Sequence, residues 1–274
     1  MDMVRTLWSA ASGMIAQQTS VDTIANNLAN VNTTGYKTEK AEFKSLLYQN
    51  LQSRTTTANG ANKPIAAQVG LGTRVASITS HFTQGNMLAS ESSTDFAIVG
   101  DGLFAVRGED GETYYTRNGR FTWAVANGGG MMLANAEGLP VLDTAGNPII
   151  LGPQYEMTRV TVSADGQIMY PDATNNPQNI GIQIGLYQFS NPAGLNKLSD
   201  SLYQETAASG PVINEATNNE VERSTVRQKW LEGSNVQVVD EMVNLIVAQR
   251  AYQMNSKAIQ AADEMLGQAN ELRR

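Results

Sequence analysis

Residues that could perform chemistry are scarce in this sequence. His81 is the only histidine, which excludes a metal site built on several histidines, and we expect it to be a surface or capping residue in a strand region. The segment GLGTRV at 70–75 begins like a dinucleotide-binding fingerprint, but Val75 occupies the position of the third glycine. Because no strand–helix–strand unit follows, the segment is predicted to be a turn that leads into a strand.

Acidic residues gather beside turn glycines. Glu109 and Asp110, like Asp95 and Asp101, are better explained as solvated hairpin tips than as the two carboxyl groups of a glycosidase. The segment EDGE at 109–112 lacks the remaining ligands of a calcium loop. The sequence therefore predicts no catalytic residue, no cofactor and no metal site, and a protein that is not an enzyme.

Arginines and cysteines add no chemistry to this picture. Arg117 and Arg120 flank Asn118-Gly119 in YYTRNGRF, where we expect a turn with exposed or ion-paired arginines. The chain has no cysteine, which excludes disulfides, zinc sites of the cysteine type and thiol catalysis.

Charge and hydropathy limit the kinds of partner. The 274 residues carry a formal net charge of −7, and residues 91–222 hold 16 Asp and Glu against 5 Lys and Arg. So acidic a middle repels polyanions, and nucleic acid is not expected as a partner. No run approaches the roughly 18 apolar residues of a membrane helix. Ser9, Ser12 and Gly13 interrupt any signal-type apolar core, so neither membrane insertion nor a cleavable signal peptide is expected.

Both ends of the chain have a helical pattern. Apolar residues three and four positions apart predict helices over 4–31 and 236–269, with Ser234 or Asn235 as the N-cap of the second. The first seam comprises Val4, Leu7, Ala11, Met14, Gln18, Val21, Ala25 and Leu28; the second comprises Leu245, Ala248, Tyr252, Asn255, Ile259, Ala262, Leu266 and Ala269. Because both seams contain alanine and polar residues, each helix should be marginal in isolation.

The first helix ends in an asparagine-rich stretch, IANNLANVNTTGYK at 24–37. Asn26, Asn27 and Asn30 are poor helix formers that favour caps and turns. A helix of this composition is stable only when it packs against something else. We therefore expect its polar face to form hydrogen bonds with neighbouring subunits.

The middle of the chain has a β pattern. Asn-Gly and Asp-Gly pairs at 59–60, 101–102, 110–111, 118–119, 127–128 and 165–166 suit hairpin turns. Strands are predicted within 95–100, 103–106, 159–170 and 180–189, and an extended arm or long loop over 53–73. The predicted fold class is α+β: N- and C-terminal amphipathic helices paired as an antiparallel coiled coil, with a central, mainly antiparallel β domain.

Three blocks of the sequence resemble the flagellar axial proteins, the family of rod, hook and hook-filament components. LWSAASGMIAQQTSVDTIANNLANVNTTGYK (7–37) is similar to the family's N-terminal signature, and residues 231–266 to its C-terminal pattern. DFAIVGDGLFAV…YYTRNGRF (95–121) resembles the central β motif, with Leu103 where the pattern usually has Phe. The length leaves no room for the outer domains of a hook protein. The segments at 70–75, 82–87 and 201–210 favour the distal part of the rod over its proximal part.

The resemblance implies a structural subunit of a self-assembling helical tube that transmits torque from motor to hook. It divides the chain into an N-terminal helix and turn (1–50), an arm (51–80), a β-rich outer domain (81–228) and a C-terminal helix (229–274). The residues expected at contacts between subunits are Leu7, Met14, Val21, Asn26, Asn27, Leu28, Asn30, Leu245, Tyr252, Asn255, Ile259 and Leu266. An arm that braces the neighbouring subunit is expected to use Thr56, Asn59, Lys63 and Pro64.

The implied partners are further copies of the chain in a helical polymer, proximal rod proteins, and hook or hook-junction proteins. The flagellar type III export apparatus is the implied exporter, and surrounding P- and L-ring proteins are further candidates. The implied location is the periplasmic rod of the basal body. Two alternatives stay open: a proximal rod or hook-type axial protein, and a secreted enzyme or adhesin with coiled-coil ends. A membrane-active amphipathic protein is disfavoured, because Arg5 is the only basic residue before Lys37.

Overall fold

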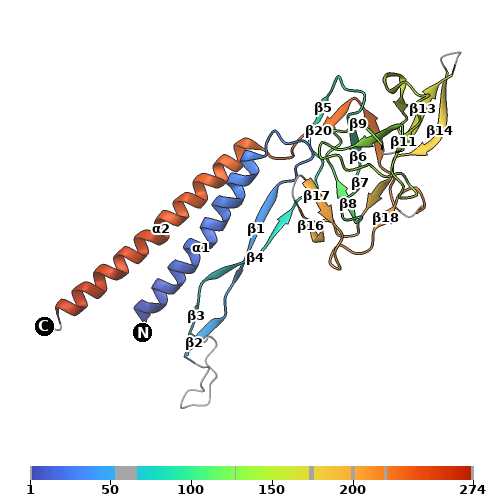
Figure 1. Ribbon diagram of the computed structural model, residues 1–274. Coiled ribbons are helices and arrows are strands. Elements are labelled where there is room, and N and C mark those ends of the chain that lie inside the picture. Colours follow the sequence, from blue (N-terminus) through green and yellow to red (C-terminus); the bar gives the residue numbers. More distant parts are fainter. Residues whose placement is uncertain are drawn as a thin grey trace. The chain divides into compact units, whose positions relative to one another are not determined.

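The structure is a computed structural model that describes residues 2–52, 67–126, 128–172, 176–198, 201–218 and 221–272. Figure 1 shows a long helix at each end of the chain and a mostly antiparallel β region between them. The protein is therefore of the α+β class, as the sequence predicts. Thr56, Asn59, Lys63 and Pro64 of the expected arm lie outside the described residues.

Two helices and many short strands make up the described chain. The helices are α1 (Asp2–Ala29) and α2 (Val238–Glu271). The strands are β1 (Glu39–Ser45), β2 (Tyr48–Gln52), β3 (Ala67–Gly70), β4 (Thr73–Ser80), β5 (Met87–Ala89), β6 (Phe96–Val99), β7 (Leu103–Arg107), β8 (Thr113–Thr116), β9 (Thr122–Val125), β10 (Met131–Ala134), β11 (Ile150–Leu151), β12 (Thr161–Val162), β13 (Gln167–Pro171), β14 (Pro177–Gln183), β15 (Leu186–Gln188), β16 (Asn196–Lys197), β17 (Leu202–Gln204), β18 (Ile213–Asn214), β19 (Thr225–Gln228) and β20 (Trp230–Glu232). Short 3-10 helices η1 (Met157–Arg159) and η2 (Pro192–Gly194) interrupt the β region.

The chain divides into two compact units. The helical unit consists of Met1–Ala29, Glu39–Thr79 and Gln237–Arg274. The β unit consists of Asn30–Thr38 and Ser80–Val236. The short segment after α1 thus belongs to the β unit, whereas the sequence grouped residues 1–50 together.

In the helical unit, α1 and α2 lie side by side and run in opposite directions (Figure 1). The most buried residues of α1 are Ala10, Ala16, Thr23, Ile24 and Asn27. Small side chains on this face let the second helix approach closely. The large residues of the predicted α1 seam lie beside this face and are only partly buried: Leu7, Met14, Val21 and Leu28.

The inner face of α2 follows the predicted seam more closely. Ala248 and Ala262 are buried, and Leu245, Asn255, Ile259 and Leu266 are partly buried. Tyr252 is 42% exposed, and Ala269 is also exposed. The predicted N-cap is wrong, because α2 begins at Val238 and the side-chain oxygen of Asn235 accepts hydrogen bonds from Thr38 instead.

Two antiparallel ribbons complete the helical unit. β1 pairs with β4, and β2 pairs with β3 through Tyr48 opposite Gly70 and Gln49 opposite Val69. β1 also contacts α1. The helix therefore packs against both a second helix and a strand.

The largest sheet of the β unit has the strand order β16-β17-β8-β7-β15-β18, and its pairs are antiparallel. Its inner side faces an apolar core in which the rings of Phe104 and Phe121 meet edge to face, 5.2 Å between centroids. A second cluster surrounds Tyr115, Phe189 and Tyr203. Both clusters lie wholly in the β unit and make it a folded body with its own core.

The turn glycines act in two different ways. The pair at 110–111 forms the predicted hairpin between β7 and β8, and Gly111 has a φ of +83°. The pair at 101–102 does not, because β6 pairs with β19 while β7 pairs with β8 and β15. At Gly119 a Cβ would lie 1.7 Å from the carbonyl oxygen of Phe96, so this glycine permits a close approach of two backbones.

Candidate functional site

The segment that follows α1 folds into a compact turn on the β unit. The backbone N–H of Thr33 donates to the carbonyl oxygen of Asn30 at 3.2 Å, and the Thr33 hydroxyl donates to the Asn30 side chain at 3.1 Å. Gly35 has a φ of +72°, and a Cβ there would lie 2.6 Å from the backbone nitrogen of Asn118. The abrupt end of the asparagine-rich helix is thus a local turn that requires glycine at position 35.

The segment before α2 lies directly against this turn. The N–H of Gly35 donates to the carbonyl oxygen of Glu232 at 2.8 Å, and the N–H of Asn235 donates to that of Tyr36 at 3.4 Å. The Asn235 side-chain oxygen accepts from the backbone and the hydroxyl of Thr38, at 2.7 and 2.6 Å. The two segments that adjoin the helices therefore bind each other within the β unit.

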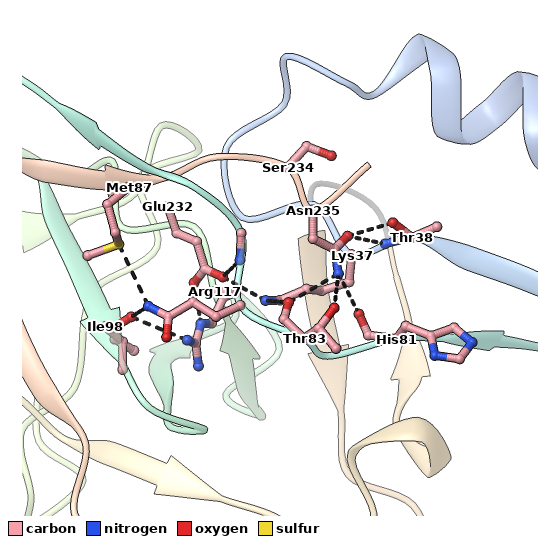
Figure 2. Close-up of polar contacts among 12 residues, drawn as sticks. Lys37, Thr38, His81, Thr83, Met87, Ile98, Arg117, Glu232, Ser234 and Asn235 are labelled. Atoms are coloured by element: carbon pink, nitrogen blue, oxygen red, sulfur yellow. Dashed lines mark hydrogen bonds and ion pairs between the residues drawn. The ribbon is translucent and has the colours of Figure 1, made fainter. Parts of the chain in front are cut away.

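Asn235 also holds the first residues of the β unit after β4. Its side-chain nitrogen donates to the carbonyl oxygens of His81 and Thr83, at 2.9 and 3.1 Å. Figure 2 shows Asn235 between Thr38 on one side and His81 and Thr83 on the other. The His81 side chain is exposed, and its backbone supplies the contact.

A buried ion-pair cluster lies beside these contacts. Lys37 Nζ lies 2.7 Å from Oε1 of Glu232, and Arg117 Nε lies 2.5 Å from Oε2 of the same carboxylate. The three side chains are 1%, 3% and 1% exposed for Lys37, Arg117 and Glu232. We call these three residues the ion-pair cluster; it contains two cations and one anion.

Hydrogen bonds to the backbone complete the ion-pair cluster. Lys37 Nζ donates to the carbonyl oxygen of Thr83 at 2.8 Å, and the N–H of Gly85 donates to Glu232 Oε1 at 2.8 Å. The Arg117 guanidinium donates to three carbonyl oxygens, those of Ile98 (3.3 Å), Gly100 (2.6 Å) and Gly102. Buried charges are tolerated when they are paired and hydrogen-bonded in this way.

Burial and charge both act on the pKa values of the ion-pair cluster. Burial alone would raise the pKa of the Glu232 carboxyl, but the attraction of Arg117 and Lys37 outweighs it and holds that pKa below its ordinary value. Burial lowers the pKa of the Lys37 ammonium, and the repulsion of Arg117 adds to this, against the opposing attraction of Glu232. The cluster is therefore adapted to hold a charged carboxylate.

The chemistry of this arrangement is structural. The Glu232 carboxylate is fully covered, and both of its oxygens are engaged by Lys37, Arg117 and Gly85. Among the described residues, no three His, Asp or Glu side chains gather so as to hold a metal ion. Neither helix, over its described length, is long and apolar enough to cross a membrane.

The asparagines of α1 have different environments. Asn27 is 1% exposed, and its side chain pairs with the backbone of Glu39, donating to the carbonyl oxygen at 2.8 Å and accepting from the N–H at 2.9 Å. Its nitrogen also lies 3.3 Å from Oε2 of Glu241 on α2. Asn26 is exposed, and Asn30 is partly buried. Asn27 is thus engaged within the chain.

Both helices leave large apolar side chains in the open. On α1, Trp8 is 70% exposed and Ile15 is 66% exposed. The exposed apolar residues of α2 include Val239 (73%), Met242 (52%), Val243 (53%), Ile246 (55%), Val247 (62%) and Met254 (64%). These side chains, together with the partly buried Leu7, Met14, Val21 and Leu28, are the candidate contact residues of the helical unit.

Sequence reasoning did not find the ion-pair cluster. Arg117 was expected in a turn, exposed or paired with no named partner, and Lys37 and Glu232 were no more than parts of the resembling blocks. Lys37 and Glu232 are 195 positions apart in the chain, and no local pattern indicates such a pair. The available signal was a lysine at the end of one terminal block and a glutamate at the start of the other.

Three family models of known proteins match the parts of the chain that contain the ion-pair cluster. Residues 7–37 match the family model described as flagella basal body rod protein, 97–170 the flagellar hook protein FlgE/F/G D1 domain, and 227–272 the flagellar basal body rod FlgEFG protein C-terminal model. Each match contains one member of the ion-pair cluster: Lys37, Arg117 and Glu232 in turn.

Curated relatives match nearly the whole chain. A flagellar basal-body rod protein FlgG from Borreliella burgdorferi is 44% identical over 99% of this chain and all of the relative. The FlgG protein of Agrobacterium fabrum is 40% identical over 96% of this chain and 97% of its own length. That of Bacillus subtilis is 34% identical over 99% of this chain and all of its own length.

Proposed function

This chain belongs to the family of flagellar basal-body rod proteins named FlgG, and we propose that many copies of it assemble through their terminal helices into the helical tube of the distal rod. Membership makes the chain a structural protein of the flagellar rod and not an enzyme. The alternative of a secreted enzyme or adhesin is thereby excluded. We propose a subunit of the distal rod in preference to the other alternative, a proximal rod or hook-type subunit.

The observation that carries the proposal is the apolar face that α2 leaves open. Val239, Val243 and Ile246 follow one another at spacings of four and three, and each is more than half exposed. Contiguous exposed apolar side chains mark interaction surfaces. When identical copies meet through different surfaces and the contact does not close into a ring, an open helical assembly results.

In this assembly α1 and α2 of one copy pair as an antiparallel coiled coil that contributes to the inner layer of the tube. Leu7, Met14, Val21 and Leu28 lie at the border of the buried face of α1, where a neighbouring helix would cover them. On α2, Leu245, Tyr252, Asn255, Ile259 and Leu266 complete the proposed contact set, with Asn26 from α1 and Asn30 from the turn that follows it. Asn27, buried against Glu39 and Glu241, would support this surface from within the chain.

The proposal assigns a distinct role to the ion-pair cluster. It joins the segment after α1 to the segment before α2, so the first and last segments of the β unit are fixed to each other. A subunit under torque needs such a connection, because force on these two ends would otherwise separate them. Lys37 is the only member that comes from the N-terminal segment.

Membership of the rod protein family also supports a location and a set of partners. The rod is the location that family membership supports, and neighbouring axial proteins are the expected partners. We extend this to proximal rod proteins at one end, hook or hook-junction proteins at the other, surrounding P- and L-rings, and a periplasmic rod reached through the type III export apparatus. Export in an unfolded form suits helices that are marginal alone, because ordering on docking is offset by the new interface.

A pair of matched substitutions tests the assembly surface. Val239→Asp places a charge on the open face of α2, and polymerisation of the purified protein, followed by electron microscopy, should be lost. An acidic residue in the first turn favours a helix, so the change should not unfold α2. Val125→Asp is the control, since Val125 is 78% exposed but belongs to β9 of the β unit. Normal tubes from the Val239 variant would refute the proposed surface.

A further inference from the structure

Two polar contacts join α1 to α2, and both belong to the same alignment of the two helices. A Cβ at Gly13 would lie 2.8 Å from the side-chain nitrogen of Asn255 and 3.3 Å from its Cγ, so the asparagine amide lies against the bare backbone of the glycine. Nearer the other end of the pair, the Asn27 amide lies 3.3 Å from the carboxylate of Glu241. Each contact joins a polar side chain of one helix to the facing surface of the other.

The spacing of the two contacts is the same on both helices. Gly13 precedes Asn27 by fourteen positions, and Asn255 follows Glu241 by the same fourteen. Fourteen residues are two heptads, or about 21 Å of helix, so both contacts lie on one seam of an antiparallel pair. Halfway between them are Ser20 and Ala248, which line one groove of the helical unit.

The buried residues of α1 follow the same seam. Ala10, Ala16, Thr23 and Asn27 are each at most 7% exposed, and Gly13 and Ser20 fill the intervening turns. This seam contains no large side chain before Ile24. Small apolar layers look alike one heptad apart, so they cannot by themselves choose between registers. The polar contacts at the two ends distinguish one register from the next.

We propose that Gly13 and Asn255 form a register lock, in which the glycine provides the only notch on this α1 seam that admits the asparagine amide, and Asn27 with Glu241 forms the second lock. A shift of one heptad would place the Asn255 amide against a residue with a Cβ and separate Asn27 from Glu241. A single polar residue at a seam position is known to specify helix register in this manner.

Contacts on the adjacent side of α1 fix its rotation. The Ser12 hydroxyl oxygen accepts a hydrogen bond from the N–H of Thr73 at 3.3 Å, and a Cβ at Gly72 would lie 2.0 Å from that oxygen. Ser12 thus faces the start of β4 while Gly13 faces α2. With one neighbour on each side, α1 cannot rotate to bring Met14 into the seam.

Disulfide trapping in the full-length chain tests the lock, and the absence of native cysteine gives a clean background. Ser20→Cys with Ala248→Cys should form a disulfide within one chain, in the free or the assembled protein. Thr23→Cys with Tyr252→Cys would face each other only after a shift of one heptad and leaves both locks intact, so this pair should form several-fold less disulfide. Linkage between chains, or equal yields from the two pairs, would overturn the proposal.

Substitutions of glycine supply the second measurement. Gly13→Leu should lower the yield of the Ser20–Ala248 disulfide at least twofold and lower the melting temperature of the helical signal. Gly267→Leu is the matched control, because Gly267 likewise lies within a helix, α2, and nothing lies within 4 Å of its added Cβ. Since leucine favours a helix over glycine, the control should melt at the same or a higher temperature.

Rescue separates a lock from a general loss of packing. Asn255→Ala removes the group that the new leucine would meet, so Gly13→Leu combined with Asn255→Ala should recover part of the lost melting temperature. The pair should not recover the selectivity between the two registers. Equal behaviour of Gly13→Leu and Gly267→Leu, or no recovery in the double variant, would show that the notch does not set the register.

Discussion

At the scale of single residues, Glu232 holds the ion-pair cluster of the β unit together. Its carboxylate is the only anion of the ion-pair cluster, and it faces two buried cations. Glu232→Gln leaves Lys37 and Arg117 without a counter-charge, which should lower the free energy of unfolding by about 3–5 kcal/mol. Urea denaturation followed by tryptophan fluorescence measures this loss.

Two further substitutions serve as comparisons for the loss of stability in Glu232→Gln. Glu222→Gln removes an exposed carboxylate and should change stability by less than about 0.5 kcal/mol. Lys37→Met removes one cation but leaves Arg117 paired with Glu232, so its cost should lie between those of the other two. If Glu232→Gln were as mild as Glu222→Gln, the cluster would not contribute to the stability of the β unit.

Acid should weaken the same cluster. The pKa of Glu232 lies below its ordinary value of 4.5 in the folded chain. A carboxyl with a depressed folded pKa contributes stability that is present above its unfolded pKa and is lost as the pH falls through its folded pKa. The difference in unfolding free energy between the native chain and Glu232→Gln should therefore be constant above about pH 5.5 and shrink steadily below pH 4.5. Denaturation curves measured from pH 7 to pH 3 give this difference directly, and a difference that widens in acid would contradict the assignment.

At the scale of elements, the segment Asn30–Thr38 is separable from the helix that precedes it. It belongs to the β unit and carries Lys37 and Gly35, both of which bind Glu232. A chain of residues 30–236 should therefore melt cooperatively, although it lacks both helices and cannot polymerise. A chain of residues 39–236 lacks Lys37 and uncovers Glu232, and it should unfold at clearly lower urea concentration.

These two chains differ only in the nine residues 30–38, so a difference in their stability is due to this segment. Both lack α1 and α2, so loss of the helices cannot explain a difference between them. Circular dichroism and sedimentation report folding and assembly in parallel. Equal urea midpoints would mean that the turn contributes nothing to the β unit, and tubes formed by residues 30–236 would mean that the helices are not needed for assembly.

At the scale of the whole molecule, the expected arm concerns the stiffness of the polymer. The resemblance implies that a rod stays straight while the related hook bends, and residues 53–73 contain segments that suit an extended brace, such as Thr55–Ala58 and the stiff Pro64. Deletion of residues 55–68 should leave polymerisation intact but give curved or flexible tubes in electron micrographs. Straight tubes from the deletion variant would show that the arm does not brace its neighbour.

Much of this protein could be read from its sequence, because local rules control that part. Seams with spacings of three and four predict both helices, and their observed ends differ from the predicted ends by about two residues. The strands within 95–100 and 103–106 and the hairpin at Gly111 were likewise predictable, since turn residues and β patterns are local signals. The long blocks at both ends sufficed to indicate the family.

Tertiary structure alone decided what those elements do with their side chains. The predicted α1 seam passes through Leu7 and Met14, which are only partly buried within the chain, whereas Ala10 and Ala16 are buried, because close approach of two helices favours small residues where a backbone is near. Arg117, which follows β8, and Glu232, at the end of β20, are 115 positions apart and became partners only when folding brought them to one buried place. Sequence periodicity gives the face of an element, whereas the partner of a buried charge depends on contacts across the whole chain.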